Sequence, residues 1–349
     1  MNRRERVHAQ VRHQQTDYCP YGGFGFDADV QRRITERLGS ERWLEMVRSH
    51  DHIQNINHRT DIFLDDWAVS KTAGEHVDLF GTSWRVDLQA YHIVRPALLE
   101  PTLKGYHFPN VSKFLPPGWE RAAQAEIERE GDRFLIICLN GIFEPAWGLR
   151  GFESLLEDMV VNSSFVEELL ERMTDLLLGL LDVYMKLPID GILMYDDWGE
   201  QRGCLFGRTR WLHFIKPHVQ RVYRRIHSAG KIAIAHCCGN IVDIVPDLIG
   251  AGLDVLESVQ PEAMDPFTLK ENFGRHLTFW GGLGTQKLIP FGTPSEIGDQ
   301  VRRLCSEMGK GGGYILAPAK SLMPETPTDN AIAVVRALLE EAGAMLPGS

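Results

Sequence analysis

The 349-residue sequence has no long apolar run, and this absence argues against a membrane-spanning helix. A span needs about 20 consecutive apolar residues. The longest run here, residues 176–181, contains Gly179 and is followed by Asp182. The basic N-terminus, MNRRERVHAQ, has no apolar stretch behind it, so we expect no secretory signal.

The sequence is also poor in positive charge and in cysteine. Its 37 basic and 47 acidic residues give a net charge of −10 without a basic stripe, which argues against a nucleic-acid partner. Six cysteines do not make a disulfide scaffold in a chain of this length, and the adjacent Cys237 and Cys238 do not suit a mutual disulfide. These features predict a cytoplasmic protein with reduced thiols.

Glycine-rich motifs that bind phosphate are missing as well. The segments GGLG at 281–284 and GKGGG at 309–313 lack the spacing of a P-loop. No glycine-rich loop follows an early strand pattern, as a dinucleotide-binding fold would require. Nucleotide chemistry is therefore not the expected function.

What the sequence does contain is a series of short apolar runs after residue 132. The runs lie at 133–140, 191–199, 231–239, 253–260, 277–284 and 312–319. Each is nearly continuous in apolar character, which is typical of a strand buried on both faces. Amphipathic helical segments separate the runs, and this alternation is the pattern of repeated βα units.

The repeated units predict a (β/α)8 TIM barrel, with a doubly wound open sheet as the alternative. We expect one domain over residues 1–349. Its first 75 residues form an N-terminal helical extension packed on the barrel, with helical patterns at 4–14, 27–38 and 40–49. Residues 77–89 have the aromatic and β-branched content of extended chain.

The ends of the predicted strands are unusually polar, and a barrel carries its active site at the carboxyl ends of its strands. The candidate substrate-binding residues at these ends are Asn140, Trp198, Gln260, Gln286 and Lys320. The candidate catalytic residues are Asp196, Asp197 and Lys320.

One strand ends in a His-x-Cys pair, His236 and Cys238. Residues i and i+2 of an extended chain point to the same side, so both side chains are placed to bind one ion, whereas Cys237 points away. Imidazole nitrogen and thiolate sulfur are ligands that zinc prefers. Glu257, at the end of the next strand, is the expected third ligand. The alternative is a buried histidine beside two packed cysteines.

Two further charged positions allow more than one interpretation. Adjacent strand residues face opposite ways, so at most one of Asp196 and Asp197 points into the barrel mouth. That one is expected to orient a substrate, to act as a general acid or to hold a ligating imidazole; the alternative is a turn or helix-cap aspartate. Lys320 binds an anionic part of the substrate or is simply solvated.

At this point the sequence resembles a known family. The segments at 230–274, 277–297 and 312–335, which include AHCCGN, FWGGLG and APAKSL, are similar to the uroporphyrinogen decarboxylase superfamily. Within it they look most like the branch of corrinoid-dependent methyltransferases. The segments at 3–20, 149–160 and 195–203 are similar too.

The resemblance implies a TIM barrel, and it implies a zinc site. In the methyltransferase branch, zinc is held by a His-x-Cys pair, matched here by His236 and Cys238, and by a later Cys that would fall near Lys320 and is missing. Cobalamin-independent methionine synthase is a more distant relative whose zinc-binding Glu corresponds to Glu257. The Arg-rich substrate loop of a genuine uroporphyrinogen decarboxylase has no counterpart in the early region.

The leading hypothesis is therefore a zinc-dependent methyltransferase that moves a methyl group between a small O- or N-methylated substrate and cobalamin on a partner corrinoid protein. Two alternatives remain: a metal-free decarboxylase or lyase, and a non-catalytic protein that binds a tetrapyrrole or corrinoid. The sequence leaves the methyl donor and acceptor, the direction of transfer and the formation of a homodimer open.

Overall fold

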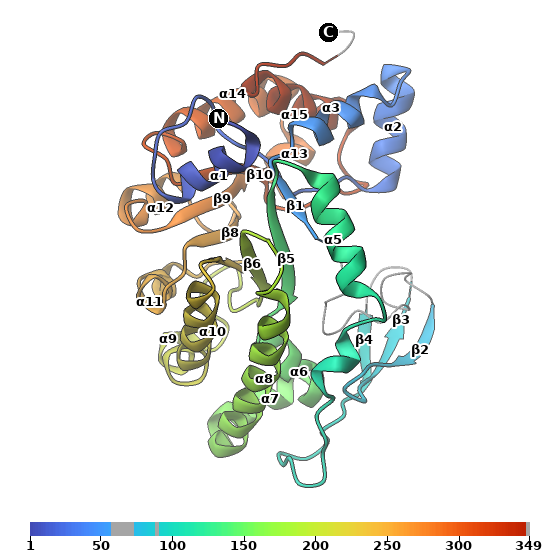
Figure 1. Ribbon diagram of the computed structural model, residues 1–349, viewed down its shortest axis with the longest axis vertical. Coiled ribbons are helices and arrows are strands. Elements are labelled where there is room, and N and C mark those ends of the chain that lie inside the picture. Colours follow the sequence, from blue (N-terminus) through green and yellow to red (C-terminus); the bar gives the residue numbers. More distant parts are fainter. Residues whose placement is uncertain (57–72, 88–90, 347–349) are drawn as a thin grey trace.

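Seven parallel strands form the main sheet of the computed structural model, which describes residues 1–56, 73–87 and 91–346. In spatial order the strands are β1 (Ile53–Asn55), β5 (Phe134–Asn140), β6 (Gly191–Tyr195), β7 (Ile232–His236), β8 (Val255–Val259), β9 (Thr278–Leu283) and β10 (Tyr314–Pro318). The six apolar runs singled out in the sequence correspond to β5–β10, so those strand predictions are confirmed. The sheet curls, as expected for an α/β fold of TIM-barrel type (Figure 1).

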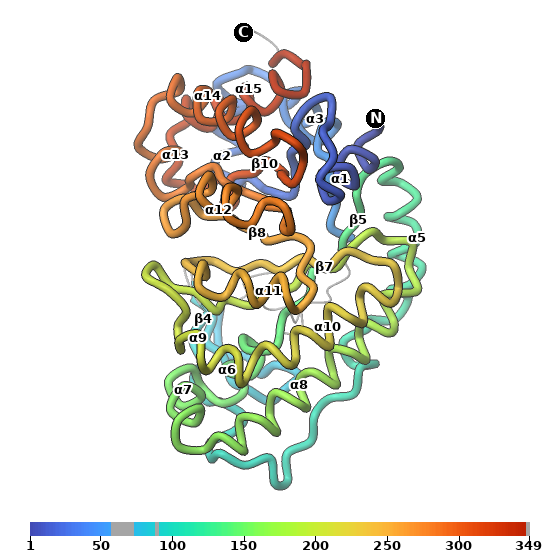
Figure 2. The backbone as a smooth tube through the Cα atoms, turned by 90° about the vertical axis from the view of Figure 1, so that its left-hand side faces the viewer, coloured from blue at the N-terminus to red at the C-terminus, as the bar shows by residue number. Residues whose placement is uncertain are grey.

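Helices alternate with the strands of this sheet and cover its outer face. After β5 they are α6 (Phe143–Arg150), α7 (Phe152–Val161), α8 (Ser163–Tyr184), α9 (Gly207–Arg210), α10 (Lys216–Ser228), α11 (Val245–Ala251), α12 (Pro266–Phe273), α13 (Leu288–Phe291), α14 (Pro294–Arg303) and α15 (Thr328–Glu341). Short 3-10 or π turns lie at Val111–Phe114, Trp211–Ile215, Val242–Ile244 and Leu304–Met308. Helices α8, α10, α11 and α12 follow one another along one side of the molecule (Figure 2).

The N-terminal region contains the expected helices, but it also contributes to the main sheet. Its helices are α1 (Arg3–Val11), α2 (Ala28–Leu38) and α3 (Arg42–His50), with α5 (Trp119–Glu130) before the first long strand. The helical extension predicted for residues 1–75 also contains one strand of the main sheet, because β1 pairs with β5. A strand of three residues with two polar side chains shows no apolar run. The end of the predicted extension, residues 57–72, lies outside the described residues.

The segment around Tyr21 links both edges of the main sheet. Tyr21 forms a parallel bridge with Leu316 of β10, and the Gly22 N–H donates to the Leu316 carbonyl at 3.3 Å. On its other side, the Tyr21 carbonyl accepts from the His52 N–H, immediately before β1, at 3.0 Å. The two edge strands, β1 and β10, are thus connected through one short piece of N-terminal chain.

A second, antiparallel sheet lies apart from the main one and away from both termini (Figure 1). It consists of β2 (Gly74–Val77), β3 (Ser83–Val86) and β4 (Tyr91–Arg95). The prediction of extended chain over 77–89 is confirmed at β3, and residues 88–90 lie outside the described part of the chain. The barrel interpretation did not anticipate this sheet.

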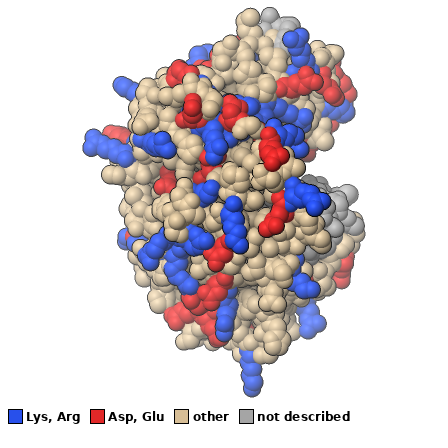
Figure 3. All heavy atoms as spheres, in the orientation of Figure 1, with Lys and Arg blue, Asp and Glu red and all other residues tan. Residues whose placement is uncertain are grey.

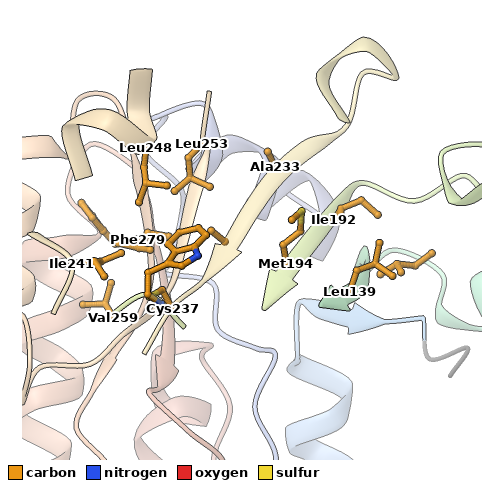
Figure 4. Close-up of a cluster of buried hydrophobic side chains, with 14 of the residues drawn as sticks. Leu139, Ile192, Met194, Ala233, Cys237, Ile241, Leu248, Leu253, Val259 and Phe279 are labelled. Carbon is orange, nitrogen blue, oxygen red and sulfur yellow. The ribbon is translucent and has the colours of Figure 1, made fainter. Parts of the chain in front are cut away.

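The core has an inner and an outer layer, and strand β5 shows the division. Phe134, Ile136 and Cys138 belong to an inner cluster that takes residues from all seven strands and Val7 from α1. Their neighbours Leu135, Ile137 and Leu139 belong to the outer cluster between sheet and helices, part of which Figure 4 shows. This alternation explains why each strand is apolar along its whole length.

The surface carries charges of both signs. On the face shown in Figure 3, basic and acidic side chains are interspersed, without a large area of one sign. Among the described residues, no helix has the length and apolar character required to cross a membrane.

Candidate functional site

A row of inward-facing side chains crosses the carboxyl-terminal part of the main sheet. The strand register aligns Asn140 with Tyr195, Tyr195 with His236, His236 with Glu257, and Glu257 with Trp280. Tyr195 and Trp280 belong to the inner cluster. Side chains in register in a parallel sheet share a face, so Asn140, His236 and Glu257 also face inward. We call these five residues the mouth row.

Three possible metal ligands come together at the ends of β6 and β7. The Nε2 atom of His236 lies 3.2 Å from the Cys238 Sγ atom and 3.9 Å from the Asp197 Oδ1 atom. One ligand atom from each of the three residues lies within 4.8 Å of the others. Tetrahedral zinc bonds of about 2.0–2.3 Å place ligand atoms roughly 3.3–3.8 Å apart. The nitrogen, sulfur and oxygen donors therefore suit zinc in type, and the two separations from His236 Nε2, 3.2 and 3.9 Å, lie close to this range.

Glu257 contacts the other nitrogen of the same imidazole. Its Oε2 atom lies 2.5 Å from His236 Nδ1, on the ring atom that does not face Cys238. Burial lowers the pKa of His236, but the Glu257 carboxylate and the Cys238 sulfur outweigh burial and hold that pKa well above its usual range. Glu257 was predicted as the third ligand; the structure brings Asp197, not Glu257, to the Nε2 side.

Cys237 points away from this cluster, as the strand alternation predicted. It is fully buried in the outer apolar layer, among residues such as Ile241 and Val259 (Figure 4). Its Sγ atom accepts the Trp198 N–H at 3.2 Å, and burial raises the pKa of its thiol well above the ordinary value. Cys237 is therefore a packed residue, whereas Cys238 faces the candidate ligands.

The two adjacent aspartates have different surroundings. Asp197 accepts the Cys238 N–H at 2.6 Å and belongs to the candidate ligand cluster. Asp196 is buried, and its carboxylate accepts from three consecutive backbone N–H groups at the start of α6, at 2.8–3.1 Å. Burial raises the pKa of Asp196 to about 6, although these N–H donors oppose the rise. Asp196 therefore matches the alternative of a helix-cap aspartate.

Two of the predicted substrate-binding residues carry buried amides with unpaired atoms. Asn140, in the mouth row, is 9% exposed, and its Oδ1 atom has no hydrogen-bond partner among the described residues. Gln260, directly after β8, is 3% exposed, and its Nε2 atom also lacks a partner within the described part of the chain. Buried amides without partners are uncommon in native proteins.

The other predicted binding residues receive less support from the structure. Trp198 is buried in the core and packs edge-on against Trp211, so a substrate has no access to it here. Gln286 is exposed, and its backbone N–H donates to Glu262 at 3.0 Å. Lys320 is exposed two residues beyond the end of β10.

Two aromatic members of the mouth row were missed in the sequence. The Tyr195 ring lies 4.7 Å from the His236 ring, centroid to centroid. The Trp280 Nε1–H donates to the Gly22 carbonyl at 3.0 Å, and a Cβ atom on Gly23 would lie 2.1 Å from the Trp280 ring. Both aromatic residues lie within apolar runs. Because both faces of such a strand are apolar, the sequence does not show which residues face inward.

Comparison with known proteins identifies the family of this fold. The sequence model described as Uroporphyrinogen decarboxylase (URO-D) matches residues 128–340, which include β5–β10 and the candidate ligands. The chain belongs to the uroporphyrinogen decarboxylase family. The resemblance inferred from the sequence motifs is thereby confirmed.

Curated relatives in this family are distant. The chain is 25% identical over 177 residues to a uroporphyrinogen decarboxylase of Magnetococcus marinus, covering 50% of this chain and 48% of that protein. It is 22% identical over 228 residues to a uroporphyrinogen decarboxylase of Methylococcus capsulatus, covering 61% of each chain. The chain thus spans about half to three fifths of the length of these relatives.

A solved structure matches the whole fold. A methyltransferase from Methanosarcina mazei superposes with a TM-score of 0.65 at 18% identity, covering 99% of this chain and 100% of that one. At this identity the similarity establishes the fold, including the N-terminal part that lies outside the family match.

Proposed function

We propose that the protein is a zinc-dependent methyltransferase of the uroporphyrinogen decarboxylase family. The observation that carries the proposal is the cluster of Asp197, His236 and Cys238 at the carboxyl ends of β6 and β7. Barrel enzymes place their chemistry at this end of the strands. Three protein ligands with one open position are typical of catalytic zinc.

The residues of the chain have distinct roles in this proposal. Zinc, when bound, supplies a Lewis acid for the heteroatom that carries the methyl group. The ligands are His236 through Nε2, Cys238 through Sγ and Asp197 through a carboxylate oxygen. Glu257 accepts the Nδ1–H of His236 and fixes the orientation of its ring, as carboxylates do for zinc-bound histidines. Asp197 thus takes the place of the thiolate that is missing near Lys320.

The methyl group is exchanged with a corrinoid on a partner protein. This part of the proposal rests on the resemblance to the corrinoid-dependent branch, and the fold shared with the Methanosarcina mazei methyltransferase supports it. We also propose that the Tyr21 segment acts as the eighth strand of a closed (β/α)8 barrel; its hydrogen bonds to Leu316 and His52 support this.

A metal-free decarboxylase is the second candidate, and the curated relatives favour it by name. Uroporphyrinogen carries many carboxylates, which a protein binds with arginine. The segment of 15–27, which leads into and follows the Tyr21 bridge, contains neither arginine nor lysine. The absence of basic side chains from this segment favours the methyltransferase.

The test combines metal analysis with a transfer assay. Protein purified without chelator is expected to contain about one zinc per chain. With chemically reduced cobalamin, it is expected to form methylcobalamin from at least one compound in a panel of methyl ethers, methylamines and methyl thioethers. A chelator should abolish the transfer and added zinc should restore it. Absence of zinc after reconstitution, together with decarboxylation of uroporphyrinogen, would establish the second candidate instead.

The Glu257→Gln variant tests whether Glu257 orients the His236 ring or is itself a zinc ligand. We expect zinc affinity to fall by about 10- to 100-fold, because the amide orients the imidazole less well while the three ligands remain. Glu262→Gln is the control, since that carboxylate accepts from backbone N–H groups of the β9–α13 loop. Competition with a chromophoric chelator measures the affinity. A loss as complete as that of Cys238→Ser would identify Glu257 as a ligand.

A further inference from the structure

The side chain of Asn140 faces the interior of the sheet at its carboxyl edge. Asn140 is the last residue of β5, and Phe134, Ile136 and Cys138, which alternate with the outward residues of that strand, belong to the inner cluster. Residues i and i+2 of a strand share a face. The register with the inward Tyr195 gives the same orientation independently.

This inward amide is buried and incompletely paired. Asn140 is 9% exposed, and its Oδ1 atom accepts no hydrogen bond from the described residues. A buried acceptor without a donor destabilises the folded protein, and a hydrophobic side chain of similar size would avoid that cost. A polar side chain in this position, at the proposed active site, is therefore explained by a partner that arrives with the substrate.

The backbone that carries Asn140 is rigidly held. The next residue, Gly141, donates its N–H to the Tyr195 carbonyl at 2.5 Å. A Cβ atom on Gly141 would lie 2.4 Å from the Asp196 side chain, and Asp196 binds the three N–H groups that follow. The backbone from which the amide projects is thus fixed before a ligand binds, which reduces the entropic cost of binding.

The position of Asn140 also limits what it binds. One strand, β6, separates Asn140 from His236 in the row, so their backbones lie about 10 Å apart at about 4.8 Å per strand. Both side chains extend toward the interior, one on each side of Tyr195. The intervening residue, Tyr195, is an uncharged aromatic residue. A ligand that contacts both Asn140 and His236 therefore has two polar groups, and several bonds separate the group at Asn140 from the atom near His236.

We propose that Asn140 is the specificity-determining residue of the methyl-transfer site, and that it binds an uncharged carboxamide or hydroxyl group of the substrate. An asparagine amide both accepts and donates, and so do these two groups. The donor of the substrate satisfies Asn140 Oδ1. The proposal rests on the proposed function, because that function places the reacting heteroatom near His236. Binding of a ligand by Asn140 can nevertheless be measured without methyl transfer.

The experiment compares binding of matched probes to the zinc-loaded wild-type protein and to Asn140→Leu. The probes are 3-methoxypropanamide, the ketone 4-methoxy-2-butanone and the anion 3-methoxypropanoate, each also tested as its methylthio and methylamino analogue. At the end that meets Asn140, the ketone and carboxylate groups have no donor for its Oδ1 atom. In the wild type, we expect the carboxamide of at least one series to bind about tenfold more tightly than its ketone, the effect of roughly one hydrogen bond. Isothermal titration calorimetry measures the affinities.

In Asn140→Leu, the preference for the carboxamide should fall below about twofold while zinc content stays unchanged. The melting temperature of the variant should stay the same or rise, because an unpaired buried amide has been removed. No preference in any series of the wild type, or the same preference in the variant, overturns the proposal. A clear fall in melting temperature also overturns it, because it would assign Asn140 a structural partner. Asn140-dependent binding without methyl transfer would instead refute the proposed function alone.

Discussion

Replacing Cys238 with serine is expected to remove most of the zinc, from about one ion per chain to less than about a tenth. A serine hydroxyl is a poor ligand for zinc compared with a thiolate. The remaining His236 and Asp197 give only two protein ligands. Metal content after dialysis, measured by mass spectrometry, provides the test.

Cys237→Ser is the matched control, since it makes the same chemical change at the neighbouring position. Its sulfur lies in the outer apolar layer and accepts the Trp198 N–H, so the variant should keep its zinc. It should lose about 1 kcal/mol of stability, because a hydroxyl replaces a thiol in an apolar environment. Equal zinc loss from both variants would contradict the assignment of Cys238 to the ligand cluster and of Cys237 to the outer apolar layer.

Replacing Asp196 with alanine is expected to lower the free energy of unfolding by about 3 kcal/mol, because three N–H groups at the start of α6 lose their acceptor. Asp196→Asn, which keeps one acceptor oxygen, should lose less. Urea denaturation monitored by circular dichroism measures both. Unchanged stability in Asp196→Ala would show that water replaces the carboxylate without cost.

The same pair of proteins should differ in pH dependence. The folded pKa of Asp196, about 6, is above that of an unfolded aspartate, so the folded protein holds this proton more tightly. The resulting stabilisation is fully present below about pH 4 and is lost as the pH rises through 6. The stability difference between wild type and Asp196→Ala should therefore be larger at pH 4.5 than at pH 7.5. A difference that grows with pH would contradict the raised pKa.

The sequence predicted the later strands well because burial on both faces produces continuous apolar runs. It could not predict β1, whose three residues, Ile53–Asn55, are too few to form a pattern. The same limit applies to Tyr21, which joins the sheet by a single bridge. The conformation of a short strand depends on the strands with which it pairs, and those strands are distant in the sequence.

At the candidate site, the sequence predicted the strand ends at which the possible ligands lie, but not which way each side chain faces. The i, i+2 rule placed His236 and Cys238 together and Cys237 apart. It could not decide which of Asp196 and Asp197 faces inward, because that depends on where β6 ends and the chain turns. Nor could it assign Glu257 to Nδ1 rather than Nε2, since the orientation of the imidazole ring is set by contacts across strands.

The bridge at Tyr21 has a consequence for how the protein folds during synthesis. Strands β5–β9 each pair with a neighbour close in sequence, so they can assemble as the chain emerges from the ribosome. The partner of Tyr21, Leu316, is synthesised long after Tyr21 itself. Before β10 exists, Gly22 and Gly23 cannot be held against Trp280 by the pairing of Tyr21 with Leu316. Such long-range pairing is slow, and the aromatic end of the mouth row is therefore among the last parts of the molecule to form.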